Sequence, residues 1–176
     1  MEFKKIQLNG FKSFAEKADF LIEDGLTGIV GPNGCGKSNI VESLRWAMGE
    51  TSAKSMRGSG MEDVIFSGTS NKASKNIAEV TIEVENKDKE GPIQYREHDQ
   101  VQIKRKIEKD KGSKFYINGK EVRARDAQMF FADLSTGAHS PSMISQGRIG
   151  ALVTAKPTDR RAILEEAAGI SGLHVR

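Results

Sequence analysis

Apolar and polar residues alternate in short runs at the start of the chain. Residues 3–8 predict a first strand, ended by the turn signal Asn9-Gly10, and a second short strand is expected near residues 20–22. A short apolar run, Leu26–Val30, leads into a glycine-rich turn. Over Ser38–Met48 the apolar residues then recur at spacings of one, three and four: Ile40, Val41, Leu44, Ala47 and Met48. Such spacing builds one apolar helix face, so we predict two strands, a third strand, a turn and a helix.

Three later runs predict an antiparallel sheet. Ile77–Val84 alternates over most of its length, and Val101–Ile107 does so with Arg105 interrupting its apolar face. Lys114–Asn118 ends in Asn118-Gly119, a strong hairpin signal. We expect these runs to form a sheet attached beside the glycine-rich turn.

The segments between these runs are less regular. Gly49–Gly60 is rich in Ser, Lys and Gly, which predicts a mobile loop, and Met61–Phe66 predicts a strand or short helix. Ala124–Leu134 has a helical pattern, and Pro157-Thr158-Asp159 is a good helix start.

The glycine-rich turn carries the clearest chemistry. Gly31-Pro32-Asn33-Gly34-Cys35-Gly36-Lys37-Ser38 matches the P-loop pattern G-x-x-x-x-G-K-[ST] between a predicted strand and a predicted helix. Gly34 and Gly36 would let backbone N–H groups approach phosphate oxygens. Lys37 would reach the β- and γ-phosphates, and the Ser38 hydroxyl would bind Mg²⁺. The alternative, a glycine-rich turn that matches by accident, does not explain the flanking strand and helix.

Bulk composition narrows the class of protein. The 176 residues suffice for one domain with a core, and 27 basic against 24 acidic residues give a charge of +3, too small to require a nucleic-acid partner. No apolar run approaches the roughly 18 residues of a membrane span, and the start lacks a signal peptide.

The single cysteine, Cys35, excludes an internal disulfide. Its position needs only a small residue, with a redox switch as the alternative. We expect a cytoplasmic protein.

The residues that would complete a P-loop ATPase are missing. Met129–Asp133 is apolar and ends in an acid, but it follows a helix start and no carboxylate comes after Asp133. Leu134–Gly137 half-matches an L-S-G-G signature. His98, His139 and His174 are scattered, without triad or metal-ligand spacing. The chain therefore has phosphate-binding machinery without an evident base, as if it were half of an active site.

Five stretches, in order and over essentially the whole chain, match the motifs of one family: Gly10–Phe14, Gly31–Asn39, Ser55–Gly58 with Glu62–Gly68, Ile144–Gly147 and Glu165–Ser171. Together they resemble the N-terminal head segment of SMC (structural maintenance of chromosomes) ATPases, with bacterial members nearest. In that family the second stretch is the Walker A motif, usually with Ser at the position of Cys35. Ile144–Gly147 resembles the Q-loop, and Glu165–Ser171 resembles the segment entering the coiled coil.

This resemblance implies an α/β fold of the P-loop NTPase class: the N-terminal lobe of an ABC-type ATPase head with an antiparallel β subdomain. Residues 1–157 would form the lobe, and residues 158–176 the helix entering the coiled coil. In the family, the C-terminal end of a longer chain supplies the Walker B Asp, the catalytic Glu and the signature motif. Two heads would sandwich two ATP molecules with Mg²⁺, and the ring would move or hold double-stranded DNA with kleisin partners.

The resemblance also implies residue roles. Gln146 would coordinate Mg²⁺ and the attacking water, and Arg57 would bring positive charge near the γ-phosphate, where a solvated loop charge is the alternative. Lys12 and Phe14 would line the adenine and ribose side. The nucleotide-binding residues would be Pro32, Asn33, Gly34, Cys35, Gly36, Lys37, Ser38 and Asn39.

Two clusters of basic residues are candidates for DNA contact. The first cluster surrounds the Asn118-Gly119 turn and consists of Lys114, Lys120, Arg123 and Arg125. The second cluster lies on the predicted strand before it and consists of Lys104, Arg105 and Lys106. Ordinary solvated strand faces are the alternative. Such contact should be salt-sensitive and blind to sequence.

Other functions fit the sequence less closely. A related ABC-type DNA-repair ATPase shares the Walker A motif, but matches the Arg57 stretch and Glu165–Ser171 less well. A stand-alone, non-hydrolysing DNA-binding module would need a well-packed monomeric fold, whereas a half-domain should expose apolar sheet surface. A simple P-loop kinase is disfavoured because no base or substrate lid is evident.

Overall fold

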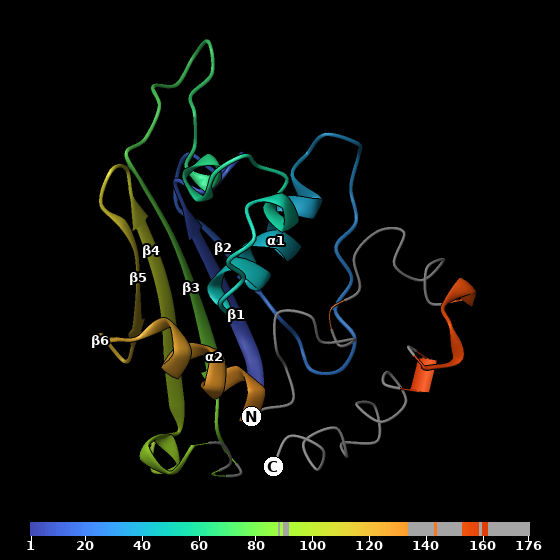
Figure 1. The fold of residues 1–176 in the computed structure, drawn as a ribbon. Helices are drawn as coiled ribbons and strands as arrows, with labels where there is room; N and C mark the ends of the chain where they lie inside the picture. Colours follow the sequence, from blue (N-terminus) through green and yellow to red (C-terminus); the bar gives the residue numbers. More distant parts are fainter. Residues whose placement is uncertain (88, 90–91, 134–142, 144–152, 159, 162–176) are drawn as a thin grey trace.

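The computed structural model of the chain describes residues 1–87, 89, 92–133, 143, 153–158 and 160–161 (Figure 1). Its centre is one six-stranded antiparallel sheet with the strand order β2-β1-β3-β4-β5-β6. The strands are β1 (Glu2–Asn9), β2 (Ala18–Leu21), β3 (Ile77–Glu85), β4 (Gln100–Glu108), β5 (Gly112–Ile117) and β6 (Lys120–Val122). The three later runs are therefore strands, as predicted, but they form one continuous sheet with β1 and β2 rather than a separate one.

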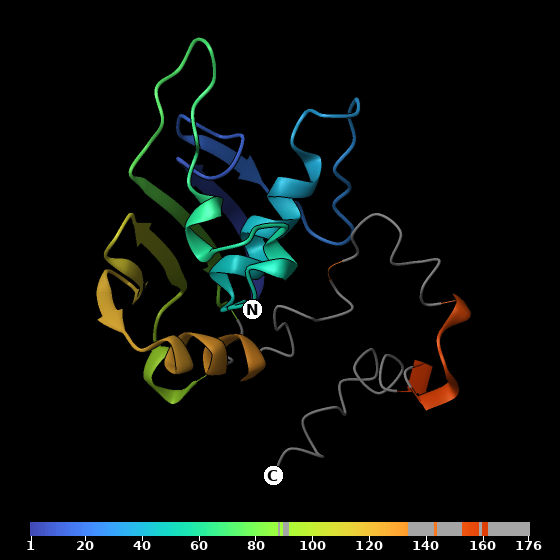
Figure 2. The same cartoon turned by 45° about the horizontal axis from the view of Figure 1, so that its top comes forward.

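In the part of the chain from residue 1 to 133 that the structure describes, two longer helices and three short 3-10 helices accompany the sheet. The predicted helices are confirmed as α1 (Lys37–Ala47) and α2 (Ala124–Asp133), and the 3-10 helices are η1 (Lys54–Met56), η2 (Met61–Val64) and η3 (Ile93–Tyr95). A helical turn also begins at Pro157, as predicted. Figure 2 shows α2 crossing near one end of the strands and α1 lying closer to β1. Among the described residues, no helix has the length and apolar character to cross a bilayer.

The sheet has one apolar face. Ile82 of β3 lies opposite Ile6 on one side and Ile103 on the other, and all three are buried. Because side chains alternate along a strand, the other face carries polar residues, with cross-strand ion pairs such as Lys106–Glu79 at 3.8 Å. Residues of both α1 and α2 belong to the same buried cluster as the apolar strand positions. Both helices therefore cover the same face.

Arg105 lies in the buried layer between β4 and α1. It is only 4% exposed, and its guanidinium lies 4.5 Å from the centre of the Trp46 ring and 4.6 Å from that of Phe115. Its Nη1 donates to the carbonyl oxygens of Trp46 and Glu50, each at 2.7 Å, at the C-terminal end of α1. Burial lowers the pKa of Arg105 to about 10, so the side chain stays charged at neutral pH. The expectation that Arg105 joins a DNA-contacting cluster is therefore wrong.

Two further expectations are corrected. The predicted strand Leu26–Val30 has no regular secondary structure and no strand partner among the described residues, with Leu26 97% and Val30 92% exposed. A strand forms only where another strand pairs with it, and this segment belongs to a loop that leaves the sheet between β2 and α1 (Figure 1). The loop Gly49–Gly60 is partly ordered, because it contains η1 and buries Met56 in the core.

We predict that Arg105→Ala destabilises the fold by about 3 kcal/mol, because two carbonyl groups at the end of α1 lose their donor and the aromatic rings lose their cation. Denaturant unfolding measures this change. Lys104→Ala, at the next position on the opposite and partly exposed face of β4, is the matched control and should change stability by less than about 0.5 kcal/mol. A loss below about 1 kcal/mol in Arg105→Ala would show that the buried arginine is not a structural anchor.

Candidate phosphate-binding site

The P-loop wraps the N-terminal end of α1. Gly36 is the N-cap residue of this helix and has a φ of 91°, and Gly34 has a φ of 82°, so both adopt the left-handed conformation that glycine tolerates. A Cβ atom on Gly36 would lie 2.8 Å from Ser13 Oγ and 3.3 Å from Phe14 Cζ. The glycine is therefore required by conformation and by space, and Ser13 and Phe14 pack directly behind the loop.

The first turn of α1 is left open to an anion. Within the described residues, no side chain caps the helix, and its first turn contains no acidic residue. The unpaired N–H groups and the positive end of the helix dipole therefore favour a bound phosphate. Ser38 is exposed in this turn, where its hydroxyl is available as a hard oxygen ligand.

Lys37 is held by its own loop. Its Nζ donates to the Gly31 carbonyl oxygen at 2.6 Å and also contacts the Pro32 carbonyl oxygen. The Cys35 thiol donates to the same Pro32 oxygen at 2.9 Å. The ammonium group thus already lies over the loop, and phosphate oxygens would compete with two carbonyl groups for it.

Three of the motifs found in the sequence meet beside the P-loop. Arg57 Nη2 donates to Asn39 Oδ1 at 2.7 Å, and Asn39 Nδ2 donates to Ser13 Oγ at 2.8 Å. Asn39 follows the P-loop serine directly, so it joins the segment around Ser13 to the loop that carries Arg57. The solvated loop charge that we considered for Arg57 is thus replaced by a defined contact with the first turn of α1.

Glu42 is the residue that the sequence analysis missed. It lies on α1 and is 7% exposed. One of its carboxylate oxygens accepts from Lys12 Nζ, and the other forms an ion pair with Arg57 Nε. Lys12 Nζ also donates to the Met56 carbonyl oxygen. The sequence held one signal: Glu42 is one helical turn before Trp46, whose size predicts burial, so the acid lies on the same face.

Asp63 fixes the loop that follows Arg57. Its Oδ2 accepts from the backbone N–H of Ser59 at 2.6 Å, from that of Gly60 at 2.9 Å and from Ser59 Oγ at 3.0 Å. These bonds, led by that from Gly60, hold the pKa of the Asp63 carboxyl below its usual range.

Some of the predicted residues lie elsewhere. Gln146 with the rest of Ile144–Gly147, the segment Glu165–Ser171, and His139 and His174 are outside the described residues. Asp133 ends α2, so Met129–Asp133 is helical and is not a strand that presents an acid at its end. Within the described part of the chain, no group of three His, Cys, Asp or Glu side chains could hold a metal ion.

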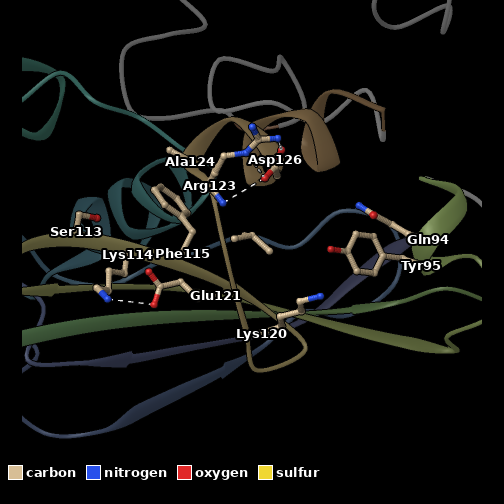
Figure 3. Close-up of a pocket in the computed structure, with 11 residues that line it drawn as sticks. Gln94, Tyr95, Ser113, Lys114, Phe115, Lys120, Glu121, Arg123, Ala124 and Asp126 are labelled. Carbon is tan, nitrogen blue, oxygen red and sulfur yellow. Dashed lines mark hydrogen bonds and ion pairs between the residues drawn. The ribbon is translucent and has the colours of Figure 1, made fainter.

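The predicted basic patch is partly neutralised. Lys114 pairs with Glu121 at 3.1 Å, and Arg123 pairs with Asp126 at 3.0 Å (Figure 3). Within the described residues, Lys120 and Arg125 make no ion pair and are exposed. An open groove of about 940 Å³ lies between the β5–β6 hairpin, the start of α2 and η3. No P-loop residue lines this groove, so it is a surface apart from the phosphate site.

We predict that protonation of Asp63 shifts the NMR signals of the Ser59 and Gly60 amides. The midpoint of this transition should lie at a lower pH than the pKa of an ordinary aspartate. Since the folded pKa of Asp63 is lowered, its bonds are present above the ordinary aspartate range near 4 and are lost as the pH falls through the folded pKa. An NMR pH titration of these two amides measures the midpoint. Asp63→Asn should abolish the transition, and a midpoint at or above 4 would contradict the assignment.

The family model for the RecF/RecN/SMC N-terminal domain matches residues 2–148. The chain is 54% identical over 176 residues to the chromosome partition protein Smc of Rhodopseudomonas palustris and 55% identical to that of Cereibacter sphaeroides. Both matches cover 100% of this chain and 15% of the relative, so the chain spans a small part of these proteins.

Solved structures of SMC heads have the same fold. A crystal structure of an Smc head bound to the C-winged helix domain of ScpA gives a TM-score of 0.86 at 32% identity, over 98% of this chain and 52% of that chain. A chain from structural work on ATP-driven dimerization and DNA-stimulated activation of SMC ATPases gives 0.82 at 30% identity, over 95% of this chain and 99% of that one. The expected fold class, the P-loop fold of an ABC-type ATPase head, is therefore confirmed.

Proposed function

The chain belongs to the RecF/RecN/SMC N-terminal domain family, and we propose that it forms the ATP-binding half of a chromosome condensation and segregation ATPase head. The observation that carries this proposal is the P-loop around the uncapped N-terminus of α1, with Lys37 folded over it. An anion-binding helix end with a lysine at its mouth is suited to the phosphates of a nucleotide.

In the proposed complex the loop backbone of Pro32, Asn33, Gly34, Cys35 and Gly36 surrounds the phosphates, with Asn39 at its end. Lys37 exchanges the loop carbonyls for the β- and γ-phosphate oxygens. When bound, Mg²⁺ would neutralise phosphate charge, and Ser38, with its exposed hydroxyl, and Gln146 would hold it.

The remaining roles concern the edges of the nucleotide. Arg57, fixed beside the first turn of α1, brings positive charge to the γ-phosphate. Phe14 flanks the adenine and ribose side, and its packing behind Gly36 supports its position next to the loop. Lys12 belongs to the same segment, with its ammonium group turned to Glu42 and the Met56 carbonyl oxygen. Lys37, Gln146 and Arg57 are the residues of this chain that we assign to the reaction.

The proposed head is completed by a C-terminal segment that supplies the acidic and signature residues. Leu26 and Val30 are exposed on a segment without a strand partner in the described part of the chain, and Val41 on α1 is only half-buried. Covering the exposed residues Leu26 and Val30 would remove apolar surface from water and stabilise the assembly. Hydrolysis then requires both this completion and dimerisation of two heads.

We extend the proposal to the rest of the protein. Residues 1–157 are the N-terminal lobe, and residues 158–176 are the helix that enters a coiled coil. The head works with a kleisin partner on double-stranded DNA in a cytoplasmic, nucleoid-associated complex, and the similarity to an Smc head bound to ScpA supports the kleisin. For DNA contact, Lys120 and Arg125 are the stronger candidates, since Lys114 and Arg123 are paired with acids.

We predict that this chain alone hydrolyses no ATP and that adding a C-terminal SMC head segment produces DNA-stimulated hydrolysis. Steady-state phosphate release, with and without DNA, measures both. Lys37→Ala should lower the rate of the mixture at least about a hundredfold, because the β- and γ-phosphates lose their cation. Lys109→Ala, an exposed lysine at the end of β4, is the control and should keep the full rate.

Robust turnover by this chain alone would contradict the half-site proposal. Nucleotide binding without hydrolysis in every mixture would instead support a non-hydrolysing, nucleotide-responsive module. An ABC-type DNA-repair head would be supported if only a C-terminal segment from that class restored activity.

We predict that Lys120→Glu weakens binding of the completed head to double-stranded DNA at every sequence tested. The logarithm of the association constant decreases linearly with the logarithm of the salt concentration. The magnitude of this slope should become smaller by about one for each lost phosphate contact. Fluorescence anisotropy at several salt concentrations measures the slope. Lys109→Glu makes the same charge change outside the patch, and an equal effect from that variant would show that total charge alone matters.

A further inference from the structure

The carboxylate of Glu42 lies between two cations beside the P-loop. Its side chain is 10% exposed and that of Lys12 is 12% exposed, whereas the side chain of Arg57 is 58% exposed. One oxygen accepts from Lys12, and the other forms an ion pair with Arg57. Lys12 thus satisfies the charge of the buried carboxylate from the protein side, and Arg57 adds a second cation on the solvent side.

We propose that Glu42 is a positioning residue that fixes the guanidinium of Arg57 for contact with a nucleotide phosphate at the P-loop. This inference rests on the proposed function, because it specifies how the same site orients one of its groups. Nothing in the sequence motifs marks Glu42, and the assignment comes from its burial and its two contacts.

The donors of Arg57 show what remains for a ligand. Nε forms an ion pair with Glu42 and Nη2 donates to Asn39 at 2.7 Å, while Nη1 has no acceptor within the described residues. Because the guanidinium is planar and rigid, two anchored nitrogens fix the direction of the third. Arg57 therefore keeps donors for a phosphate in a plane that the protein has already set.

Both anchors belong to the helix that carries the P-loop. Asn39 and Glu42 are three residues apart on α1 and lie on neighbouring positions of the same face. The backbone of Arg57, by contrast, belongs to the loop after α1 and has a φ of 53°. The side chain is thus held in the frame of the phosphate site, independently of movement in its own loop.

Removing one charge at Glu42 should therefore misplace Arg57 without removing it. Glu42→Gln keeps the size of the side chain, but its amide nitrogen cannot accept a hydrogen bond, so the two cations compete for one oxygen. In the completed head with its C-terminal segment, we expect kcat to fall between about tenfold and about a hundredfold, with KM for ATP changed less than about threefold.

A double-mutant cycle separates positioning from general damage. If Glu42 acts through Arg57, Arg57→Ala alone and Glu42→Gln combined with Arg57→Ala should have the same kcat within about twofold. Glu42→Asp, which keeps the charge at shorter reach, should recover part of the loss. Glu83→Gln, which removes an exposed ion-paired carboxylate on the polar face of β3, is the matched control and should match the unmodified head.

Two results would overturn the inference: an unchanged kcat in Glu42→Gln, or a double variant whose loss is the product of the two single losses. Thermal unfolding is measured on each variant. If Glu42→Gln does not fold, Glu42→Asp is the deciding variant. A Glu42→Asp head with a normal Tm and a reduced kcat supports the positioning role, whereas a normal kcat in that variant contradicts it. Failure of the unmodified head to bind and hydrolyse ATP in a Lys37-dependent way would instead defeat the proposed function itself.

Discussion

The one-sided sheet is the constraint on which the rest of the structure depends. Its apolar face must be covered, and α1 covers it with Trp46, whose ring packs against Phe11 at 5.5 Å. Arg105 then fixes the other end of the contact by donating to carbonyl groups at the C-terminal end of α1. With that end fixed, the N-terminal end and its P-loop have one position relative to the sheet.

The phosphate site is assembled from segments that are far apart in the chain. The turn after β1 supplies Lys12 and Ser13, α1 supplies Asn39 and Glu42, and the loop after α1 supplies Arg57. A buried carboxylate is stable only when it is paired, and Glu42 is paired twice. The pairing that satisfies the carboxylate therefore also brings these segments together, so stability and site geometry have one cause.

The sequence predicted the elements whose signal is local. Alternation located β3 and β4, the Asn118-Gly119 hairpin is present with both residues at positive φ, and the P-loop pattern identified the turn into α1. Contacts between distant segments were not predictable in this way. Arg105 breaks the alternation of its strand, yet it is buried because the aromatic rings and carbonyl oxygens around it come from other elements.

The largest difference from expectation is at Leu26–Val30. The apolar, β-branched composition of this segment favours a strand, but strand formation depends on a partner, and the described part of the chain provides none there. We interpret the missing pairing as the mark of a fold that is completed by another segment. The exposed apolar residues, and the lack of a catalytic acid at the site within the described residues, then have the same explanation.

The most direct test of this interpretation is hydrogen–deuterium exchange at the backbone amides of residues 26–30. The account predicts exchange close to that of an unstructured segment in this chain alone, and strong protection once a C-terminal SMC head segment is bound, because the new strand pairing removes these amides from water. Protection already present in the chain alone, or no change on binding, would contradict the account.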